Sequence, residues 1–350
     1  MGMTSSQRLQ ETLSHREPDR VPYVISAAMH PAREMGLTIK AYFSRPQNVV
    51  DGQVWLHKKF GNDMLCCYPF AALEILAWGG EAIYFDQGPP NAGPPIIKKP
   101  EDIFFLEPPE VKKNPALQGV LEAIAGLKAI VGGDTPIAGV IVSPFSLPIM
   151  QMGFEAYLDL IYERPDLLER LLGINTEYCT AWANAQLEAG AAAVMYSDPA
   201  FSPAIMSRDL ILQYGVPTAV NVISRIKGSV MIHMASGKGL PVVDEISRAG
   251  FVAMSASAEE DLGALKDACR GRLALVGNLN ALDMRYWTAG EIESKIKKAI
   301  AQAGPGGGFV LSDNHGEIPF PVDEDILLTI AETVRRWGQY PLDWIGFDEM

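Results

Sequence analysis

The chain has 350 residues, of which 48% are hydrophobic, and its 42 acidic against 29 basic residues give a formal net charge of −13. Because binding to a phosphate backbone draws on many cations, this balance argues against a nucleic-acid partner. No segment reaches the roughly 18 apolar residues of a membrane span, and residues 1–20 lack the basic and then apolar pattern of a secretory signal. We therefore expect a cytoplasmic protein with no membrane partner.

Short apolar runs that end in polar or turn residues recur along the chain and predict β-strands. There are eight of them, at residues 21–26, 64–68, 137–143, 192–197, 230–233, 251–255, 273–277 and 308–312. Their nearly continuous apolar character is typical of parallel strands that are covered on both faces.

The segments between these runs carry helix signals. Pro165 can open a long helix that Gly190 closes, and Thr288 with Glu291 forms a capping box ahead of another helix. Eight strands alternating with helices predict an α/β fold of the (β/α)8 TIM barrel type. A doubly wound sheet is the alternative, but the sequence lacks its Gly-rich dinucleotide-binding turn.

Residues 86–115 are too rich in proline for a regular helix. We expect them to form an ordered excursion over the barrel mouth, within a single domain that spans residues 1–350. If the excursion is ordered, its apolar side chains must be buried, namely those of Ile96, Ile97, Phe104, Phe105 and Leu106.

Side chains at the carboxyl ends of barrel strands share one mouth, so polar residues at those positions are candidates for a site. The predicted catalytic residues are His315, His233, Asp198 and Glu74. The predicted substrate-binding residues are His30, Arg33, Tyr68 and Asp313. Structural roles are the alternative: His233 can bond a loop carbonyl, His315 can belong to a turn before Gly316, and Asp198 can cap a turn.

Five stretches together resemble the uroporphyrinogen decarboxylase superfamily, whose members share a (β/α)8 barrel. They are "HREPDRVPYV" (15–24), "AQLEAGAAAVMYSDPAFSPAIMSRDL" (185–210), "VMIHMASG" (230–237), "LALVGNLNALDM" (273–284) and "AGPGGGFVLSDNHGEIP" (303–319). Their order and spacing agree with the superfamily over nearly the whole chain, so the resemblance implies a TIM barrel of the uroporphyrinogen decarboxylase type.

One branch of the superfamily decarboxylates a tetrapyrrole and holds its acidic arms with an Arg-rich loop after the first strand. The corresponding loop here, "SAAMHPAREMG" (26–36), contains only Arg33. A single guanidinium is a poor match for several carboxylates, so the resemblance to this branch is the weaker one. Decarboxylation stays an alternative, as does a module that binds a corrinoid or tetrapyrrole without catalysis.

The other branch comprises corrinoid-dependent methyltransferases, which move a methyl group between a small molecule and a cobamide on a partner protein. Members that act on thiols bind zinc through a His-x-Cys motif and a second Cys after the last strand. This sequence keeps the motif's His233, has Ala235 in place of its Cys, and has His315 where the second Cys is expected. The thiolate ligands are therefore absent, although His233 and His315 with carboxylates still form a tentative set of metal ligands.

The resemblance thus implies a methyltransferase that demethylates a small methoxylated or N-methylated compound, with a corrinoid protein as partner and its cobamide as cofactor. A zinc ion on His233 and His315 can polarise the leaving oxygen, and without metal His315 and Asp313 can supply a general acid. Facing His233, the imidazole of His315 is expected to point into the barrel mouth. A homodimer is compatible with this interpretation.

Overall fold

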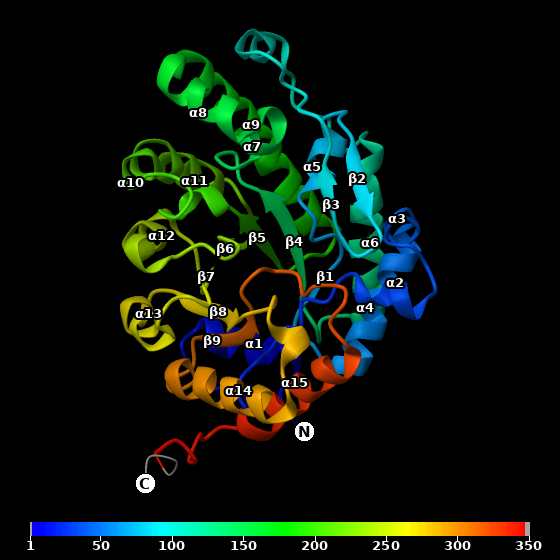
Figure 1. Cartoon of the computed structure of the whole chain (residues 1–350), viewed down its shortest axis with the longest axis vertical. Helices are drawn as coiled ribbons and strands as arrows, with labels where there is room; N and C mark the ends of the chain where they lie inside the picture. The colour runs from blue at the N-terminus through cyan, green and yellow to red at the C-terminus, as the bar shows by residue number, and fades with distance from the viewer. Residues whose placement is uncertain (1, 347–350) are drawn as a thin grey trace.

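Seven parallel strands curl around one axis, with helices over their outer faces (Figure 1). The computed structural model describes residues 2–346. The sheet has the order β1-β4-β5-β6-β7-β8-β9. The strands are β1 (Leu65–Cys66), β4 (Ile137–Val142), β5 (Ala193–Ser197), β6 (Ser229–His233), β7 (Ala253–Ser255), β8 (Ala274–Leu279) and β9 (Phe309–Asp313). The α/β barrel class is confirmed.

Helices alternate with these strands, and a small hairpin of β2 (Ala82–Phe85) and β3 (Gly88–Ala92) adds to them. The helices up to the middle of the chain are α1 (Ser5–Leu13), α2 (His30–Glu34), α3 (Ile39–Phe43), α4 (Pro46–Phe60), α5 (Ala72–Ala77), α6 (Pro115–Val131), α7 (Leu147–Met152), α8 (Phe154–Glu163) and α9 (Pro165–Ala189). Those that follow are α10 (Arg208–Leu210), α11 (Val216–Ile223), α12 (Val243–Ala249), α13 (Leu262–Cys269), α14 (Ala289–Ala303) and α15 (Glu324–Trp337). Among the described residues, no helix is long and apolar enough to cross a membrane.

The predicted helix signals are confirmed at both places. Helix α9 begins at Pro165 and ends with Gly190 as its cap, whose φ of 121° is one that residues with a side chain rarely adopt. In α14 the Thr288 hydroxyl accepts from the Glu291 N–H while the Glu291 carboxylate accepts from the Thr288 N–H. These local hydrogen bonds satisfy backbone donors that a helix start leaves free.

Residues 21–26, predicted as a strand, occupy the gap between β9 and β1 without forming a regular ladder. On one side the Val24 N–H donates to the Leu311 carbonyl at 2.9 Å. On the other side the Asn62 side chain accepts from the Ile25 N–H at 2.9 Å and donates to the Ile25 carbonyl at 3.1 Å. The Asp63 N–H also donates to the Tyr23 carbonyl at 3.0 Å, so a side chain and one backbone bond take the place of a strand ladder and close the barrel here.

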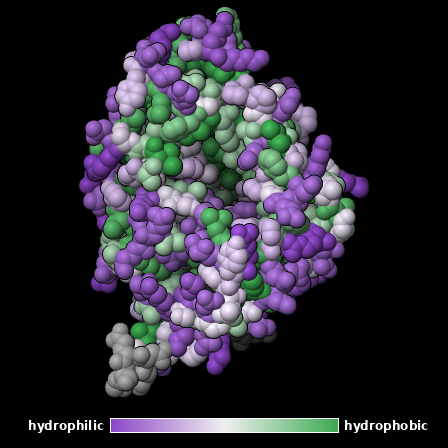
Figure 2. All heavy atoms as spheres, viewed as in Figure 1, coloured by the Kyte–Doolittle hydropathy of each residue, from purple (hydrophilic) through white to green (hydrophobic). Residues whose placement is uncertain are grey.

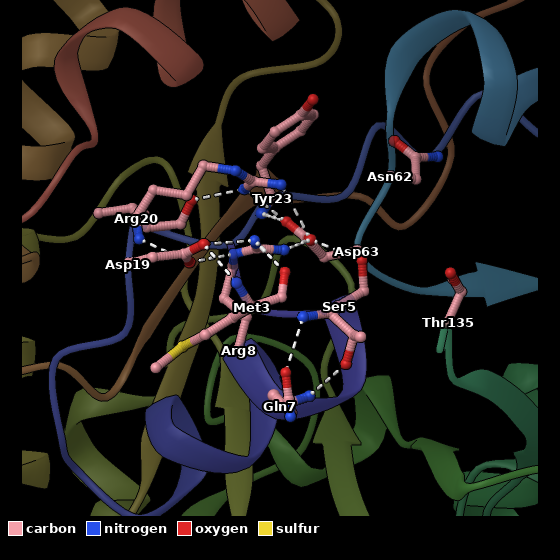
Figure 3. Close-up of polar contacts among 12 residues, drawn as sticks. Met3, Ser5, Gln7, Arg8, Asp19, Arg20, Tyr23, Asn62, Asp63 and Thr135 are labelled. Carbon is pink, nitrogen blue, oxygen red and sulfur yellow. Dashed lines mark hydrogen bonds and ion pairs between the residues drawn. The ribbon is translucent and has the colours of Figure 1, made fainter. Parts of the chain in front are cut away.

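A buried cluster of charged side chains holds residues 21–26, the closing segment, in place (Figure 3). Asp63 is fully buried and accepts from Arg8 Nη1 at 2.6 Å, from Arg20 Nη1 at 2.7 Å and from the Tyr23 N–H at 2.9 Å. Arg8 also pairs with Asp19 through its Nε at 2.7 Å. The cluster therefore joins α1, the closing segment and the start of β1 at one point.

The edge of β4 next to β1 is also completed by side chains. Strand β1 pairs with β4 over only two residues, which leaves the rest of that edge without a strand partner. Gln186 from α9 accepts from the Val140 N–H and donates to the Val140 carbonyl, both at 2.8 Å. Glu74 from α5 accepts from the Val142 N–H at 2.9 Å, and its burial raises the pKa of the carboxyl to about 7.

Residues 86–115 contain β3 and the 3-10 helix η1 (Pro100–Phe105), which lies beside α9 at the top of Figure 1. Ile97 and Ile103 are buried, but the expected burial of Phe104 and Phe105 is wrong, because these side chains are 50% and 85% exposed. Arg170 of α9 donates to the carbonyls of Ile103 and Phe104. These backbone contacts hold η1 on one face only, so its two Phe side chains remain in solvent.

Replacing Asp63 by Asn tests the charge cluster at constant shape. Asp63→Asn leaves Arg20 without a carboxylate partner and Arg8 with Asp19 alone, and a buried charge that loses its partner is costly. We expect the free energy of unfolding to fall by about 3–5 kcal/mol, measured by urea denaturation at pH 7. Asp166→Asn, which breaks an exposed pair with Arg164, is the matched control and should change stability little. Equal effects of the two variants would contradict the role given to Asp63.

Glu74 should make stability depend on pH. Its folded pKa of about 7 lies above its ordinary 4.5, so the folded state holds a proton that the unfolded state has lost between these values. Stability should therefore fall as pH rises from about 5 to 7, with a slope of up to about 1.4 kcal/mol per pH unit from this group. Glu74→Gln keeps an acceptor for the Val142 N–H and should reduce the slope in denaturation curves measured at several pH values. Glu332→Gln, at an exposed position, should keep the wild-type slope, and a wild-type slope in Glu74→Gln would disprove the assignment.

Candidate functional site

A cavity opens inside the barrel at the carboxyl ends of the strands, and we call it the mouth cavity. Figure 2, in the same view as Figure 1, shows a hollow near the middle of this face with hydrophobic residues around it. Its apolar wall includes Val24, Met64, Ala138, Met195, Met231 and Val276. Its polar lining includes Ser26, Cys66, His233, Ser255, Ser312, Asp313 and Glu317. Alternation along the strands explains the wall, since Met195 points inward while Val194 and Tyr196 are fully buried against the outer layer.

The mouth cavity ends on a thin apolar layer. Four residues line both the mouth cavity and a second cavity at the opposite end of the barrel, next to α1, namely Val24, Met64, Met231 and Val276. These four side chains therefore separate the two cavities inside the barrel. A ligand in the mouth cavity meets methionine thioethers and aliphatic groups at its deepest point.

His233 lies at the end of β6 and is 8% exposed. Its Nε2 donates to the carbonyl oxygen of His315 at 3.0 Å. That bond holds the proton on Nε2 and leaves Nδ1 as an acceptor. Burial lowers the pKa of the imidazole, so His233 is neutral at physiological pH. The structure thus places His233 in the mouth cavity in a state that accepts a hydrogen bond there.

The loop after β9 brings two carboxylates into the cavity. Asp313 is 4% exposed, and its Oδ1 accepts from the N–H groups of His315 at 2.8 Å and Gly316 at 2.6 Å. Its Oδ2 has no hydrogen-bond partner among the described residues. Glu317 lies nearby, and burial together with the charge of Asp313 raises the pKa of its carboxyl well above the ordinary value.

Gly316 allows this loop to pass close to His233. Its φ is +82°, and a Cβ at this position would lie only 2.6 Å from the Nε2 of His233. Any other residue would therefore push the loop away from the imidazole. The sharp turn predicted at Gly316 is present, and it aims the carbonyl of His315, not its ring, at His233.

The imidazole of His315 points elsewhere than expected. Its Nδ1 bonds to the Ser236 hydroxyl in the loop after β6, and the side chain does not line the mouth cavity. The two imidazoles therefore do not share a ligand position. Within residues 2–346 no group of three or more His, Cys, Asp or Glu side chains is arranged to hold a metal ion. With Ala235 in place of a thiolate, these donors do not fit a zinc centre.

Asp198 and Glu74 are buried in the walls around the cavity and do not line it. Asp198 accepts from the Ser146 hydroxyl at 2.6 Å, and its N–H donates to the carbonyl of His233 at 2.8 Å. Burial raises the pKa of its carboxyl to about 7. Asp198 thus positions the end of β6 through a backbone hydrogen bond. Glu74 has a similar structural role, since it completes the edge of β4.

The three other predicted binding residues also lie outside the mouth cavity. His30 is fully buried, donates to the Val322 carbonyl at 3.1 Å, and has its pKa lowered to about 4 by burial. Arg33 is exposed, with its guanidinium 4.5 Å from the ring centroid of Phe320. Tyr68 packs against Phe43 with ring centroids 5.6 Å apart. Of the eight predicted site residues, the structure brings His233 and Asp313 to the cavity.

Sequence reasoning missed Glu317, Cys66 and Ser312, which line the cavity. Glu317 had a signal, because it is an acid that follows the last predicted strand at the end of the barrel where the site is expected. Ser312 and Cys66 are small residues within predicted strands and offered none.

Comparison with known proteins places this site in a family. The family model described as uroporphyrinogen decarboxylase (URO-D) matches residues 4–337. A methylcobamide:CoM methyltransferase of Methanosarcina barkeri is 31% identical over 230 residues, which cover 64% of this chain and 65% of that relative. The match thus spans less than two thirds of that relative's length. A uroporphyrinogen decarboxylase of Neisseria meningitidis is 25% identical over 269 residues, 73% of this chain and 74% of the relative.

The solved structure of a methyltransferase from Methanosarcina mazei has the same fold. It superposes with a TM-score of 0.87 at 22% identity and covers 95% of this chain and 99% of its own. Since the family model extends over nearly the whole barrel, the chain belongs to the uroporphyrinogen decarboxylase (URO-D) family.

Proposed function

We propose that this chain is a corrinoid-dependent methyltransferase. It removes a methyl group from a small methoxylated or N-methylated compound and passes it to a cobamide that a partner corrinoid protein holds. A methylcobamide methyltransferase among its relatives supports this assignment. The observation that carries it is the lining of the mouth cavity, which has apolar walls and the carboxylates of Asp313 and Glu317, with no Lys or Arg among the described lining residues.

Decarboxylation of a tetrapyrrole is the second candidate, supported by relatives of that name. Its substrate carries many carboxylates, which would meet Asp313 and Glu317 at the cavity instead of cations. The one guanidinium of the loop after the closing segment, that of Arg33, lies over Phe320 on the surface. The charges of the cavity therefore favour methyl transfer over decarboxylation.

The residues of the cavity define what the protein contributes. Its apolar wall can hold the methyl-bearing part of a substrate, and the neutral His233 offers an acceptor at Nδ1. When the methyl group leaves an oxygen, that oxygen needs a proton, which a protonated Glu317 can donate. When it leaves an ammonium nitrogen, the product is a neutral amine and no proton is needed. Because the donors do not fit zinc, no step is assigned to that metal.

Methyl transfer to cob(I)alamin tests the assignment directly. Incubation with a panel of methoxyarenes and methylamines should give methylcobalamin from at least one member, followed by its absorbance. Uroporphyrinogen should give no coproporphyrinogen under the same conditions. Decarboxylated product, or no transfer from any donor by folded protein, would contradict the proposal.

His233→Ala should reduce transfer on the order of 10²-fold, because it removes the bond that holds the loop of Asp313 in place. His233→Gln can keep a donor to the His315 carbonyl and should lose less. Initial rates and thermal melts of both variants distinguish a positioning role from unfolding. Equal rates in Ala, Gln and wild type would show that the bond has no part in the reaction.

A further inference from the structure

Asp313 holds a carboxylate oxygen that the protein itself does not satisfy. The residue is 4% exposed, its Oδ1 is occupied by two backbone N–H groups, and its Oδ2 has no partner within the described chain. An unsatisfied buried acceptor costs free energy, and a charged one costs more. Asp313 also lines the mouth cavity, so its carboxyl group lies at the cavity wall with one oxygen that no described residue satisfies.

Glu74 and Asp198 also keep one oxygen without a partner among the described residues, but their situation differs. Neither lines the mouth cavity, and burial raises the pKa of each to about 7, so a proton can satisfy them. Asp313 thus combines a free, buried carboxylate oxygen with a place on the cavity wall.

Glu317 adds a second carboxyl to the same wall. The Met29 N–H lies 3.4 Å from its Oε1, a long distance for a hydrogen bond. The cavity offers these acids no counter-charge, since its described lining contains no Lys or Arg and the ring of His233 is neutral with its Nε2 proton committed to His315. Burial and Asp313 raise the pKa of Glu317, and a cation beside both carboxyls favours loss of that proton, so that both acids then attract the ligand.

We infer that the methyl donor is a cation, a small N-methylated ammonium whose charge faces Asp313 and Glu317 while its methyl groups contact Met64, Met195 and Met231. The inference rests on the proposed methyltransferase function and selects the nitrogen substrates over the ethers. Methyl groups on a quaternary or tertiary ammonium are apolar, which suits the thioether wall. The two acids attract the positive charge, and the apolar wall contacts the methyl groups.

The transfer balances without a proton donor. The C–N bond breaks and its electron pair stays on nitrogen, so the ammonium leaves as a neutral amine. The methyl carbon takes both electrons of its new bond from the cobalt(I) of the partner's cobamide, which is thereby oxidised by two electrons. The neutral amine no longer carries the positive charge that Asp313 and Glu317 attract, and this favours its release.

Two isosteric probes test the charge requirement without any corrinoid. Choline and its neutral isostere 3,3-dimethylbutan-1-ol differ only by nitrogen against carbon, and their affinities can be measured by calorimetry. We expect choline to bind at least about 10-fold more tightly, in keeping with one charged contact of about 1.4 kcal/mol or more. Equal affinities, or binding of the alcohol alone, would overturn the inference.

Asp313→Asn and Glu317→Gln should each weaken choline binding at least about 10-fold and leave the alcohol unchanged. The Asn side chain can keep the acceptor that Oδ1 provides to the turn, and Glu317 lies outside that turn. Weaker binding in both variants would therefore not be explained by a disrupted turn. Glu34→Gln, an exposed acid on α2, is the matched control and should bind both probes as wild type does. Unchanged choline affinity in both cavity variants would also refute the inference.

Methyl transfer separates this inference from the function on which it rests. Transfer from methylated ammonium compounds, with none from methoxyarenes, is the expected result. Transfer from methoxyarenes alone would reject the cationic substrate and leave the methyltransferase assignment standing. Tight choline binding without transfer from any donor would instead reject the methyltransferase assignment and keep the cation site.

Discussion

The barrel depends on the charges around Asp63. The segment that closes the barrel forms no regular ladder, and it is joined to the stretch ahead of β1 by the side chains of Asn62 and Asp63 and by one backbone bond, from the Asp63 N–H to the Tyr23 carbonyl at 3.0 Å. Arg8 and Arg20 compensate the buried carboxylate, and α1 is fixed by the same contacts (Figure 3). Such a cluster is stabilising only when complete, because a buried charge that loses its partner is costly.

Closure at this point also builds the site. The loop after β9 lies beside the closing segment, where the Ile318 N–H donates to the Ser26 carbonyl at 2.7 Å. That contact and the bond from His233 to the His315 carbonyl hold the loop from two sides. Asp313 and Glu317 therefore face the mouth cavity because strands far apart in the sequence meet there. The cation site is a consequence of how the barrel is closed.

Buried acids serve different purposes in this fold. Asp63 is paired with two guanidinium groups, and Glu74 replaces a missing strand partner for Val142. Asp198 accepts from a hydroxyl in the wall, whereas Asp313 lines the mouth cavity and has one oxygen without a partner among the described residues. The family fold itself is shared by methyltransferase and decarboxylase relatives, so the chemistry must follow from the loops at the mouth. In this chain those loops present acids instead of guanidinium groups.

The sequence alone determined the elements of the barrel, because apolar runs and helix caps are local signals. The runs at 137–143 and 192–197, and the capping box at Thr288, lie where the pattern predicted them. Only the tertiary structure decided which strand-end side chains reach the cavity. Position after a strand sets a residue's height in the barrel, whereas the direction of its side chain depends on partners from distant segments. Ser236 turns the ring of His315 away from the cavity, and the short β1 draws Glu74 to the edge of β4, because each polar group takes the hydrogen bond that the assembled fold offers it.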